Sequence, residues 1–407
     1  MMILMQFKDR EFVPIILGSD INTYSVARAF FEEYQVKSVV IGKYKSGPSN
    51  GSQMIDYIED VNIDKTETFL SRINQLSMKY KDKKIILLGA GDNYINMITN
   101  KHSQLPDNVI APFIPHELMN NLQKKDYFYE LCEEVGVDYP DTLLISREMG
   151  LDFDVPFEYP VILKSSESIH YWEYPFEGQE KVYIIDNREE LNEIIEKIYN
   201  SGYPEKLIVQ DMIPGNDEYM YVLTSYSDQS GKVVMMCLGN VLLEEHTPLG
   251  KGNHAVIITD RNEELMRQAR EFLENIHYVG FSNFDIKYDY RDGKYKFFEI
   301  NTRQGRSNYY VTASGFNVAR YLVDDYIYNK DMDLELSKDP YLWTVVPDWV
   351  ALKYVKQEEN VKQIKQLIDE GKEVNPLFYK PDNAIYRRLR MIKATLSHYY
   401  KYKKYYK

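Results

Sequence analysis

The sequence predicts a protein of mixed α/β and α+β class, with an N-terminal parallel α/β domain followed by two lobes built on antiparallel sheets. Apolar runs at residues 13–17 and 84–88 each end in a glycine-containing turn and continue into a helical pattern. This strand–helix alternation is typical of parallel sheets. Residues 281–300 instead form two alternating segments around Asp292-Gly293, which is the signature of an antiparallel hairpin.

The composition is that of an ordinary globular protein. The chain has 407 residues, 44% hydrophobic and 27% charged, and its net charge of −13 argues against nucleic-acid binding. No apolar run approaches the roughly 18 residues of a spanning helix, and the leading MMILM is too short for a secretory signal. Cys132 and Cys237 are the only cysteines, so we expect no disulfide framework and a cytoplasmic location.

The first domain is expected to span residues 1–118. The run at 13–17 leads through Gly18-Ser19-Asp20 into the helical pattern SVARAFFEEY and then the strand SVVIG. Glycine turns at strand ends lie where parallel sheets usually bind ligands. Glycines that only make tight strand-to-helix turns are an equally good interpretation.

The next elements predict two lobes joined near residues 210–215. Helical periodicity alternates with short apolar strands, and a Pro214-Gly215 break separates the lobes. From about residue 331 the chain becomes polar and helical, and it ends in a basic, tyrosine-rich tail. The expected elements between these points are helices at 121–135, 187–200 and 263–276, and strands at 142–145, 159–164, 206–210, 218–226, 232–240 and 254–260.

Oxygen-bearing side chains gather on the predicted hairpin. Asp285 lies on its first strand, and Glu299 and Asn301 lie at the end of its second. Two carboxylates and an amide oxygen suit Mg²⁺, which also takes ligands from phosphates. Arg303 and Arg306 follow at once, and fixed guanidinium groups beside an acid cluster indicate metal-assisted phosphoryl chemistry. A charged hairpin rim without a ligand is the alternative.

The pattern Asp285…Glu299-Ile-Asn301-Thr-Arg303 resembles the metal-binding signature of the ATP-grasp superfamily, mostly carboxylate–amine ligases. The resemblance implies a two-lobed ATP-grasp domain over residues 119–330, a helical extension over 331–407, and ATP with Mg²⁺ as cofactors. It makes Asp285, Glu299 and Asn301 the metal ligands. The nucleotide contacts that it implies, in the helix start, the strand YPVILK and the segment LIVQDMIPGNDE, are Lys125, Lys164, Gln210, Asp211, Met212, Ile213 and Glu218.

Longer segments, including YPVILKSSES and NYYVTASGFNVARYLVDD, resemble the branch that contains bacterial D-aspartate ligases. This branch attaches D-aspartate to the lysine of a peptidoglycan precursor, and the resemblance implies amide formation through an acyl phosphate. Arg303 and Lys251 are then the expected catalytic residues, and Arg306, Gly18 and Asn22 the expected substrate contacts. A ligase for a different amino acid, or a catalytically silent nucleotide-binding protein, remains an alternative.

The tail carries eight Lys or Arg between residues 387 and 407 and no acidic residue. Basic and aromatic residues together suit the surface of an anionic membrane, so the tail is a candidate for peripheral contact with the inner face of the membrane. A disordered end or a helix packed on the body is the alternative. The oligomeric state is left open.

Overall fold

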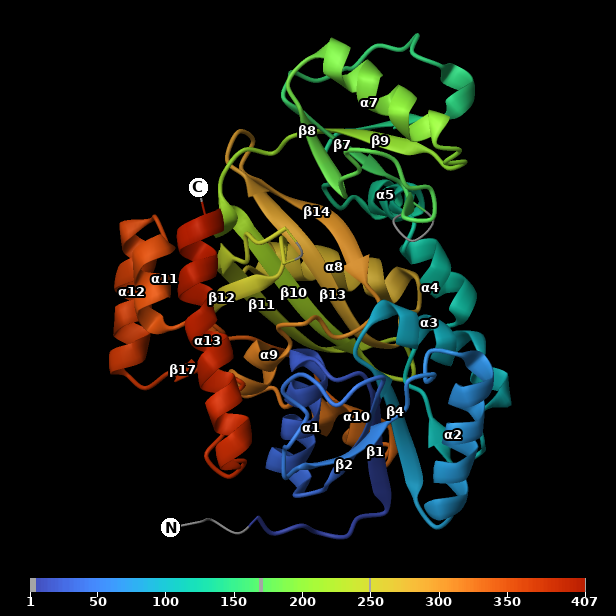
Figure 1. The fold of residues 1–407 in the computed structure, drawn as a ribbon, viewed down its shortest axis with the longest axis vertical. Coiled ribbons are helices and arrows are strands. Elements are labelled where there is room, and N and C mark those ends of the chain that lie inside the picture. The colour runs from blue at the N-terminus through green and yellow to red at the C-terminus, as the bar shows by residue number, and fades with distance from the viewer. Residues whose placement is uncertain (1–4, 168–170, 249, 407) are drawn as a thin grey trace.

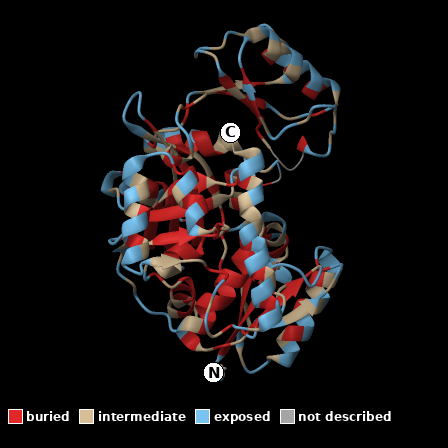
Figure 2. Ribbon diagram, turned by 60° about the vertical axis from the view of Figure 1, so that its left-hand side comes forward, coloured by how far each residue is buried: buried red, intermediate tan, exposed pale blue. Residues whose placement is uncertain are grey.

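The computed structural model describes residues 5–167, 171–248 and 250–406. Within these residues the chain forms three sheets, which Figure 1 shows one after another along the long axis of the molecule. The N-terminal sheet lies at one end, the largest sheet in the middle and the smallest at the other end. Figure 2 shows that the buried residues concentrate on the strands and on the helix faces that cover them.

The N-terminal sheet is parallel throughout, with the strand order β3-β2-β1-β4-β5, as predicted. Strand β1 is buried along its whole length because helices cover both faces of the sheet. Helix α1 begins after Asp20, whose carboxylate accepts a hydrogen bond from the backbone N–H of Thr23 at 3.0 Å. The elements are β1 (Phe12–Leu17), α1 (Ile21–Tyr34), β2 (Ser38–Gly42), β3 (Ile55–Glu59), α2 (Thr66–Lys79), β4 (Lys84–Gly89), α3 (Asp92–Asn100) and β5 (Val109–Ile110).

The smallest sheet is antiparallel, with the order β6-β9-β7-β8, and forms the first predicted lobe. Helix α7 covers one face with Leu191, Ile195 and Ile198, which recur at helical spacing and are fully buried. Helices α4 and α5 precede this lobe. The elements are α4 (His116–Leu122), α5 (Lys125–Val135), β6 (Thr142–Ile145), β7 (Val161–Ser165), β8 (Val182–Ile185), α7 (Arg188–Asn200) and β9 (Leu207–Asp211).

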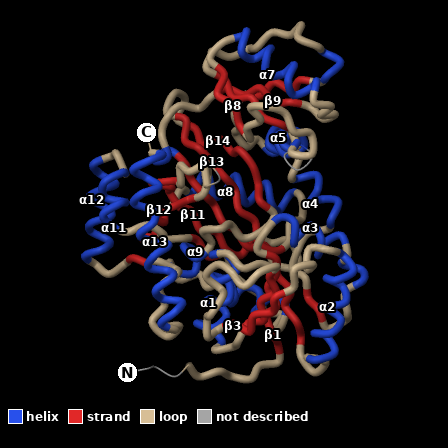
Figure 3. Tube along the Cα trace, in the orientation of Figure 1, coloured by secondary structure: helices blue, strands red, loops and turns tan. Residues whose placement is uncertain are grey.

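The central sheet has the order β14-β13-β10-β11-β12-β16-β17, and β15 pairs with β11. The predicted hairpin is β13 and β14, which pair antiparallel. Helix α8 packs on one face, where Phe272 contacts Phe128 of α5 and Phe284 of β13. Figure 3 shows the helices grouped around this sheet. The elements are β10 (Met220–Ser227), β11 (Val233–Glu244), β12 (His254–Asp260), α8 (Glu263–Asn275), β13 (Gly280–Asp289), β14 (Lys294–Asn301), α9 (Tyr309–Ala313) and α10 (Val318–Tyr326).

The segment after residue 331 contains the predicted helices and also extends the central sheet. Trp343 on β16 is fully buried against the core, and β16 pairs with the free edge of β12. The edge of β12 offers unpaired backbone donors and acceptors, and β16 pairs with them. The sequence pattern of so short a strand does not predict this pairing. The elements are β15 (Glu335–Leu336), β16 (Leu342–Thr344), α11 (Asp348–Tyr354), α12 (Glu358–Asp369), β17 (Glu373–Val374) and α13 (Ile385–Tyr405).

The basic tail is the helix α13, and one of its faces packs on the body of the protein. Arg387 is buried at its start, where it donates hydrogen bonds to the carbonyl oxygens of Pro48 and Leu377 at 3.0 and 3.1 Å. Its guanidinium also lies 3.5 Å from the buried carboxylate of Asp382 and over the ring of Tyr24. The tail is therefore ordered. No helix in the described part of the chain is long and apolar enough to cross a membrane.

Replacing Arg387 by methionine should lower the free energy of unfolding by about 3 kcal/mol, because the change leaves Asp382 buried without its cation. Urea denaturation of the purified chain measures this. Arg388→Met is the matched control, because Arg388 is exposed on the same helix, and it should change stability by less than about 0.5 kcal/mol. Equal effects of the two changes would show that Arg387 does not anchor α13.

Candidate active site

A cavity of about 400 Å³ lies between the smallest sheet and the central sheet. Three acidic side chains line it, from Glu244, Asp285 and Glu299, together with the ring of Phe298 and the imidazole of His254. Positive charge predominates in the lining. The basic residues are Lys125, Lys164, Lys181, Lys251, Arg303 and Arg306.

A β-bulge turns the acidic residues of the hairpin into this cavity. Asp285 lies directly opposite Glu299, and the register then shifts so that Ile286 pairs with Phe297. The extra residue is Phe298, and it lines the cavity beside Glu299, while Phe297 is buried in the core on the other face. Bulges are known to re-aim side chains in this way. Strict alternation would have placed Phe298 in the core.

The two facing carboxylates differ in their electrostatic surroundings. Lys125 Nζ lies 2.8 Å from Glu299 Oε2, and this ammonium lowers the pKa of Glu299. Burial and the nearby charge of Glu299 raise the pKa of Asp285. Asn301 Nδ2 donates a hydrogen bond to Asp285 Oδ2 at 3.2 Å. The three predicted metal ligands are therefore brought together, and the raised pKa of Asp285 indicates that Lys125 alone does not offset the charge of two ionised carboxylates.

This group fits a hard divalent cation. In the part of the chain that the structure describes, no three or more His, Cys, Asp or Glu side chains are placed so that they could hold a metal ion together, so a cage made entirely of such ligands is not formed there. Mg²⁺ does not need one, because it usually binds one or two carboxylates and completes its shell with waters and phosphate oxygens. Asp285, Glu299 and Asn301 offer that kind of incomplete shell.

Lys164 is buried at the end of β7 and faces the same cavity. Its ammonium donates to Gln210 Oε1 at 2.8 Å and to the hydroxyl of Tyr129 at 3.3 Å. Burial and the charge of Lys125 lower the pKa of Lys164 to about 7. Gln210, predicted as a nucleotide contact, also donates to Thr142 Oγ1 at 2.8 Å. The side chain of Gln210 therefore orients Lys164 and is buried behind it.

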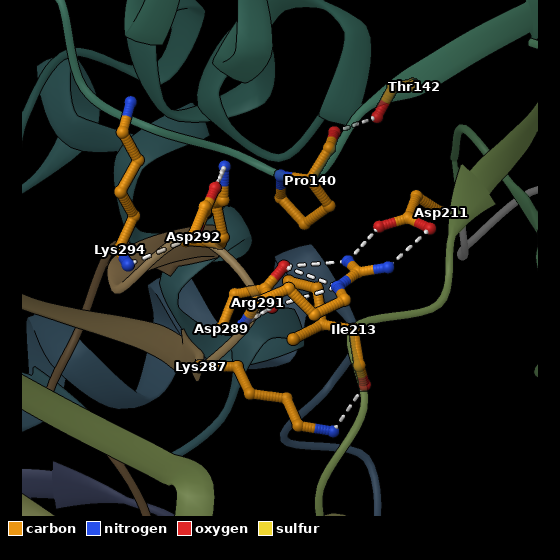
Figure 4. A network of polar contacts seen from close by, with 10 residues as sticks. Pro140, Thr142, Asp211, Ile213, Lys287, Asp289, Arg291, Asp292 and Lys294 are labelled. Carbon is orange, nitrogen blue, oxygen red and sulfur yellow. Dashed lines mark hydrogen bonds and ion pairs between the residues drawn. The ribbon is translucent and has the colours of Figure 1, made fainter. Parts of the chain in front are cut away.

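The predicted hinge lies where the chain leaves the smallest sheet. Figure 4 shows Arg291, in the β13–β14 turn, between the carboxylates of Asp289 and Asp211. Lys287 donates hydrogen bonds to the carbonyl oxygens of Ile213 and Gly215, both at 2.9 Å. Asp211, Met212 and Ile213 are not part of the cavity lining. The carboxylate of Asp211 and the carbonyl oxygen of Ile213 are already bound by Arg291 and Lys287. Their contact with the nucleotide remains a prediction.

Glu218 has a structural function in this arrangement. Its carboxylate is buried and accepts hydrogen bonds from the backbone N–H groups of Lys356 and Gln357 and from the side chain of Asn360. These donors lie at the start of α12, so Glu218 caps that helix. The nucleotide contact predicted for Glu218 remains a prediction, and it would require this carboxylate to give up these donors.

Arg303 is held by the N-terminal domain. Its guanidinium contacts both carboxylate oxygens of Asp92, in the first turn of α3, at 2.5 and 3.0 Å. Three other cavity cations differ, since Lys181, Lys251 and Arg306 make no side-chain hydrogen bond or ion pair within the described ranges. Unpaired cations facing one cavity form a site for anions.

The predicted substrate contacts from the first strand–helix turn lie behind the cavity. Asn22 on α1 is buried, donates to the carbonyl oxygen of Gln304 at 3.2 Å and accepts from the side chain of Asn308. Gly18 has φ 135° and donates to the carbonyl oxygen of Ile41. Neither residue lines the cavity. Asn22 instead supports the segment that carries Arg303 and Arg306, and direct substrate contact remains a prediction.

Helix α13 holds the loop that connects β11 to β12 and carries Lys251. Lys401 Nζ lies 2.8 Å from Glu245 Oε1, and the hydroxyl of Tyr402 donates to the carbonyl oxygen of Glu244 at 2.5 Å. Burial and the nearby Asp217 raise the pKa of Glu244 to about 7. The end of the chain therefore positions one wall of the site.

Comparison with known proteins identifies the family. Residues 125–322 match the model for the carbamoyl-phosphate synthase L chain, ATP binding domain. The chain is 39% identical over 411 aligned positions to a D-aspartate ligase from Enterococcus faecium (strain Aus0004), and the match covers 98% of each protein. The chain belongs to the D-aspartate ligase family. This family lies within the ATP-grasp carboxylate–amine ligases, as the resemblance implied.

Solved structures agree on the fold. An N5-carboxyaminoimidazole synthetase from Staphylococcus aureus matches with a TM-score of 0.61 at 16% identity, over 88% of each chain. An L-amino acid ligase from Bacillus licheniformis matches with a TM-score of 0.54 at 14% identity, over 78% of this chain and 75% of that one. The predicted ATP-grasp architecture is therefore confirmed.

The sequence did not predict several residues of the candidate active site of this D-aspartate ligase family member. Lys181, Glu244 and His254 line the cavity, and Asp92 holds Arg303. Glu244 and Asp92 each follow an apolar strand, and this position is the only feature of the sequence that could have indicated a role for them. Nothing in the sequence singles out Lys181 on the approach to β8, or His254 among seven histidines.

Glu299→Gln should lower ATP turnover at least about 10²-fold, because the change removes one negative charge from the metal-type cluster while keeping its shape. Phosphate release by the folded variant measures this. Glu271→Gln, on the exposed face of α8, is the matched control and should leave the rate unchanged. Parent-like turnover by Glu299→Gln would make the assignment of Glu299 wrong.

Stability should fall below pH 6.5 because of two shielded histidines. Burial is the main cause that lowers the pKa of His254 and of His398 from 6.5 to about 4. Below pH 6.5 these histidines bind protons in the unfolded chain but stay neutral in the folded chain. The loss of folding free energy therefore grows as the pH falls towards 4 and is absent above 6.5. Between pH 7 and 5.5 it should reach about 1 kcal/mol for each histidine.

Urea denaturation at several pH values checks this. His398→Gln should flatten the dependence by about half of the histidine contribution, and His102→Gln, an exposed histidine of the N-terminal domain, should not. An identical slope in the parent and in His398→Gln would rule out the effect for His398.

Proposed function

We propose that this protein joins D-aspartate to the side-chain amine of lysine in a peptidoglycan precursor, at the expense of ATP and through an acyl phosphate. Support comes from the name of the relative that matches over nearly the whole chain and from the ATP-binding family that covers the cavity. A cytoplasmic location fits this proposal, since ATP is available there.

The cavity supplies the groups that acyl phosphate formation needs. Asp285, Glu299 and Asn301 would hold Mg²⁺, which would supply positive charge to offset that of the phosphates. Lys125 and Lys164 approach the same space from α5 and β7, where they would hold the phosphates. Arg303, fixed by Asp92, would face the charge that develops as the carboxylate attacks the γ-phosphorus.

The observation that carries the proposal is the set of cavity cations without ionic partners in the described residues. The triphosphate accounts for part of this charge. Lys251 and Arg306, on the central-sheet side, remain for the carboxylates of the acid substrate. A dicarboxylic amino acid has one carboxylate to react and one to bind, so it matches a site that has cations beyond those needed for ATP. An uncharged side chain would leave one such cation unpaired.

Aspartate should therefore be preferred over alanine and serine by at least about tenfold in kcat/KM, since a cation that the bound substrate covers but does not pair costs about 1–3 kcal/mol. The measurement is phosphate release with ATP, each amino acid in both enantiomers and a lysine-containing muropeptide, with product masses read by mass spectrometry. We expect D-aspartate to give the aspartyl product.

Arg306→Gln should reduce the preference for aspartate and raise KM for it, with a smaller effect on KM for ATP. Lys338→Gln, outside the cavity, is the control. A product mass for alanine, glycine or serine with none for aspartate would contradict the substrate and leave the ligase assignment intact. ATP turnover that no amino acid stimulates would contradict the ligase activity itself.

A further inference from the structure

Helix α13 presents an apolar stripe on the face that points away from the body. Ile385, Leu389, Ile392, Leu396 and Tyr400 recur at steps of three or four residues and so lie along one side of the helix. They are exposed: Ile385 by 76%, Leu389 by 61% and Leu396 by 50%. The stripe spans about 22 Å, given the rise of about 1.5 Å per residue. We call these five residues the outer stripe.

The opposite side of the same helix accounts for its contacts with the protein. Arg387, Met391, Thr395 and Tyr402 are buried against the body. The outer stripe is therefore not needed to hold α13 in place. Figure 1 shows the helix at the surface beside α11. Contiguous apolar exposure of this kind marks an interaction site.

Positive charge borders the outer stripe. Arg388, Lys393, Lys403 and Lys404 are exposed on α13, and no acidic residue follows Asp382 in the chain. Arg387, Arg390 and Lys401 are used internally, in contacts with the first domain and with Glu245. Within the described residues none of these four outward-facing bases forms an ion pair, and Lys404 lies over the ring of Tyr405.

Aromatic side chains extend the same surface. Trp349 of α11 is half exposed and lies against Tyr399 of α13, with ring centroids 5.0 Å apart. Tyr400, next to it, is also exposed. Tryptophan and tyrosine favour the level of the headgroups, where an apolar ring and a polar edge are both accommodated.

We propose that the outer stripe and its basic border are a docking surface for an anionic lipid bilayer. An in-plane amphipathic helix with apolar residues on one side and lysine or arginine at the border binds such a surface by burying the apolar side chains among the headgroups. The rest of the chain is acidic overall, but screening limits its repulsion to about 8 Å at physiological salt.

The charge pattern disfavours a second copy of the chain as the occupant. Pairing two α13 helices in either direction would bring lysines and arginines against one another with no acidic residue on either helix to offset them. An anionic bilayer offers the opposite charge along the whole stripe. Docking would leave the inner side of α13, and with it the loop that carries Lys251, in place.

The test is co-sedimentation of the full chain with vesicles of phosphatidylcholine alone or of phosphatidylcholine mixed with phosphatidylglycerol, at low and physiological salt. We expect binding to the anionic vesicles to exceed binding to neutral ones by at least about tenfold. Leu389→Gln/Leu396→Gln and Arg388→Glu/Lys393→Glu should each reduce it by at least about tenfold. Met78→Gln, which removes an exposed apolar side chain of α2, should bind like the parent.

Three results would overturn the proposal. The first is equal partitioning of the parent with anionic and neutral vesicles. The second is parent-like binding by both double variants, which would place the contact elsewhere. The third is a dimer in light scattering that Leu389→Gln/Leu396→Gln dissolves, without vesicle binding by the parent. Ligase activity on a soluble muropeptide should be the same in all variants, so failure of docking is distinguishable from failure of the proposed function.

Discussion

The facing carboxylates of Asp285 and Glu299 set the constraint on which the site depends. Two acids opposite one another on paired strands cannot both ionise at low cost without positive charge nearby. Lys125 supplies part of it from the start of α5 and so keeps Glu299 ionised. The same lysine then opposes the charge of Lys164. The two acids therefore repel one another, as do the two lysines, and a bound metal–nucleotide pair would relieve both repulsions.

The β13–β14 hairpin carries the acidic residues of the site and also contacts the segments that connect the two lobes. Its bulge directs Glu299 and Phe298 into the cavity. At its other end, Arg291 binds Asp211 where the chain leaves the smallest sheet, and Lys294 lies 2.7 Å from Asp138 where the chain enters it. Both crossings between the lobes are thus attached to one hairpin, and Figure 4 shows the attachment through Arg291. Movement of the smaller lobe would therefore shift the strands that carry Asp285 and Glu299.

Local pattern was sufficient for much of the fold and for the centre of the site. Alternation and the Asp-Gly turn predicted the hairpin, and residue types at its end predicted the group of Asp285, Glu299 and Asn301. Contacts between distant parts of the chain were not predictable in this way. The cap that Glu218 makes on α12 joins residues about 140 positions apart, and no periodicity reports such a pairing. The bulge at Phe298 also escaped, because an inserted residue leaves the composition of a strand unchanged.

The Arg303–Asp92 contact bears on how far the catalytic part of this chain can be separated from the remainder. The matched family segment, residues 125–322, contains the acids and the bases that line the cavity. It lacks Asp92, the donors that Glu218 uses at the start of α12, and the lysine of α13 that holds Glu245. Excised alone, it would carry a carboxylate that has lost most of its donors and an arginine without its anchor. The segment that matches the ATP-binding family is thus recognisable by its ancestry, but it depends on the rest of the chain for its folded structure.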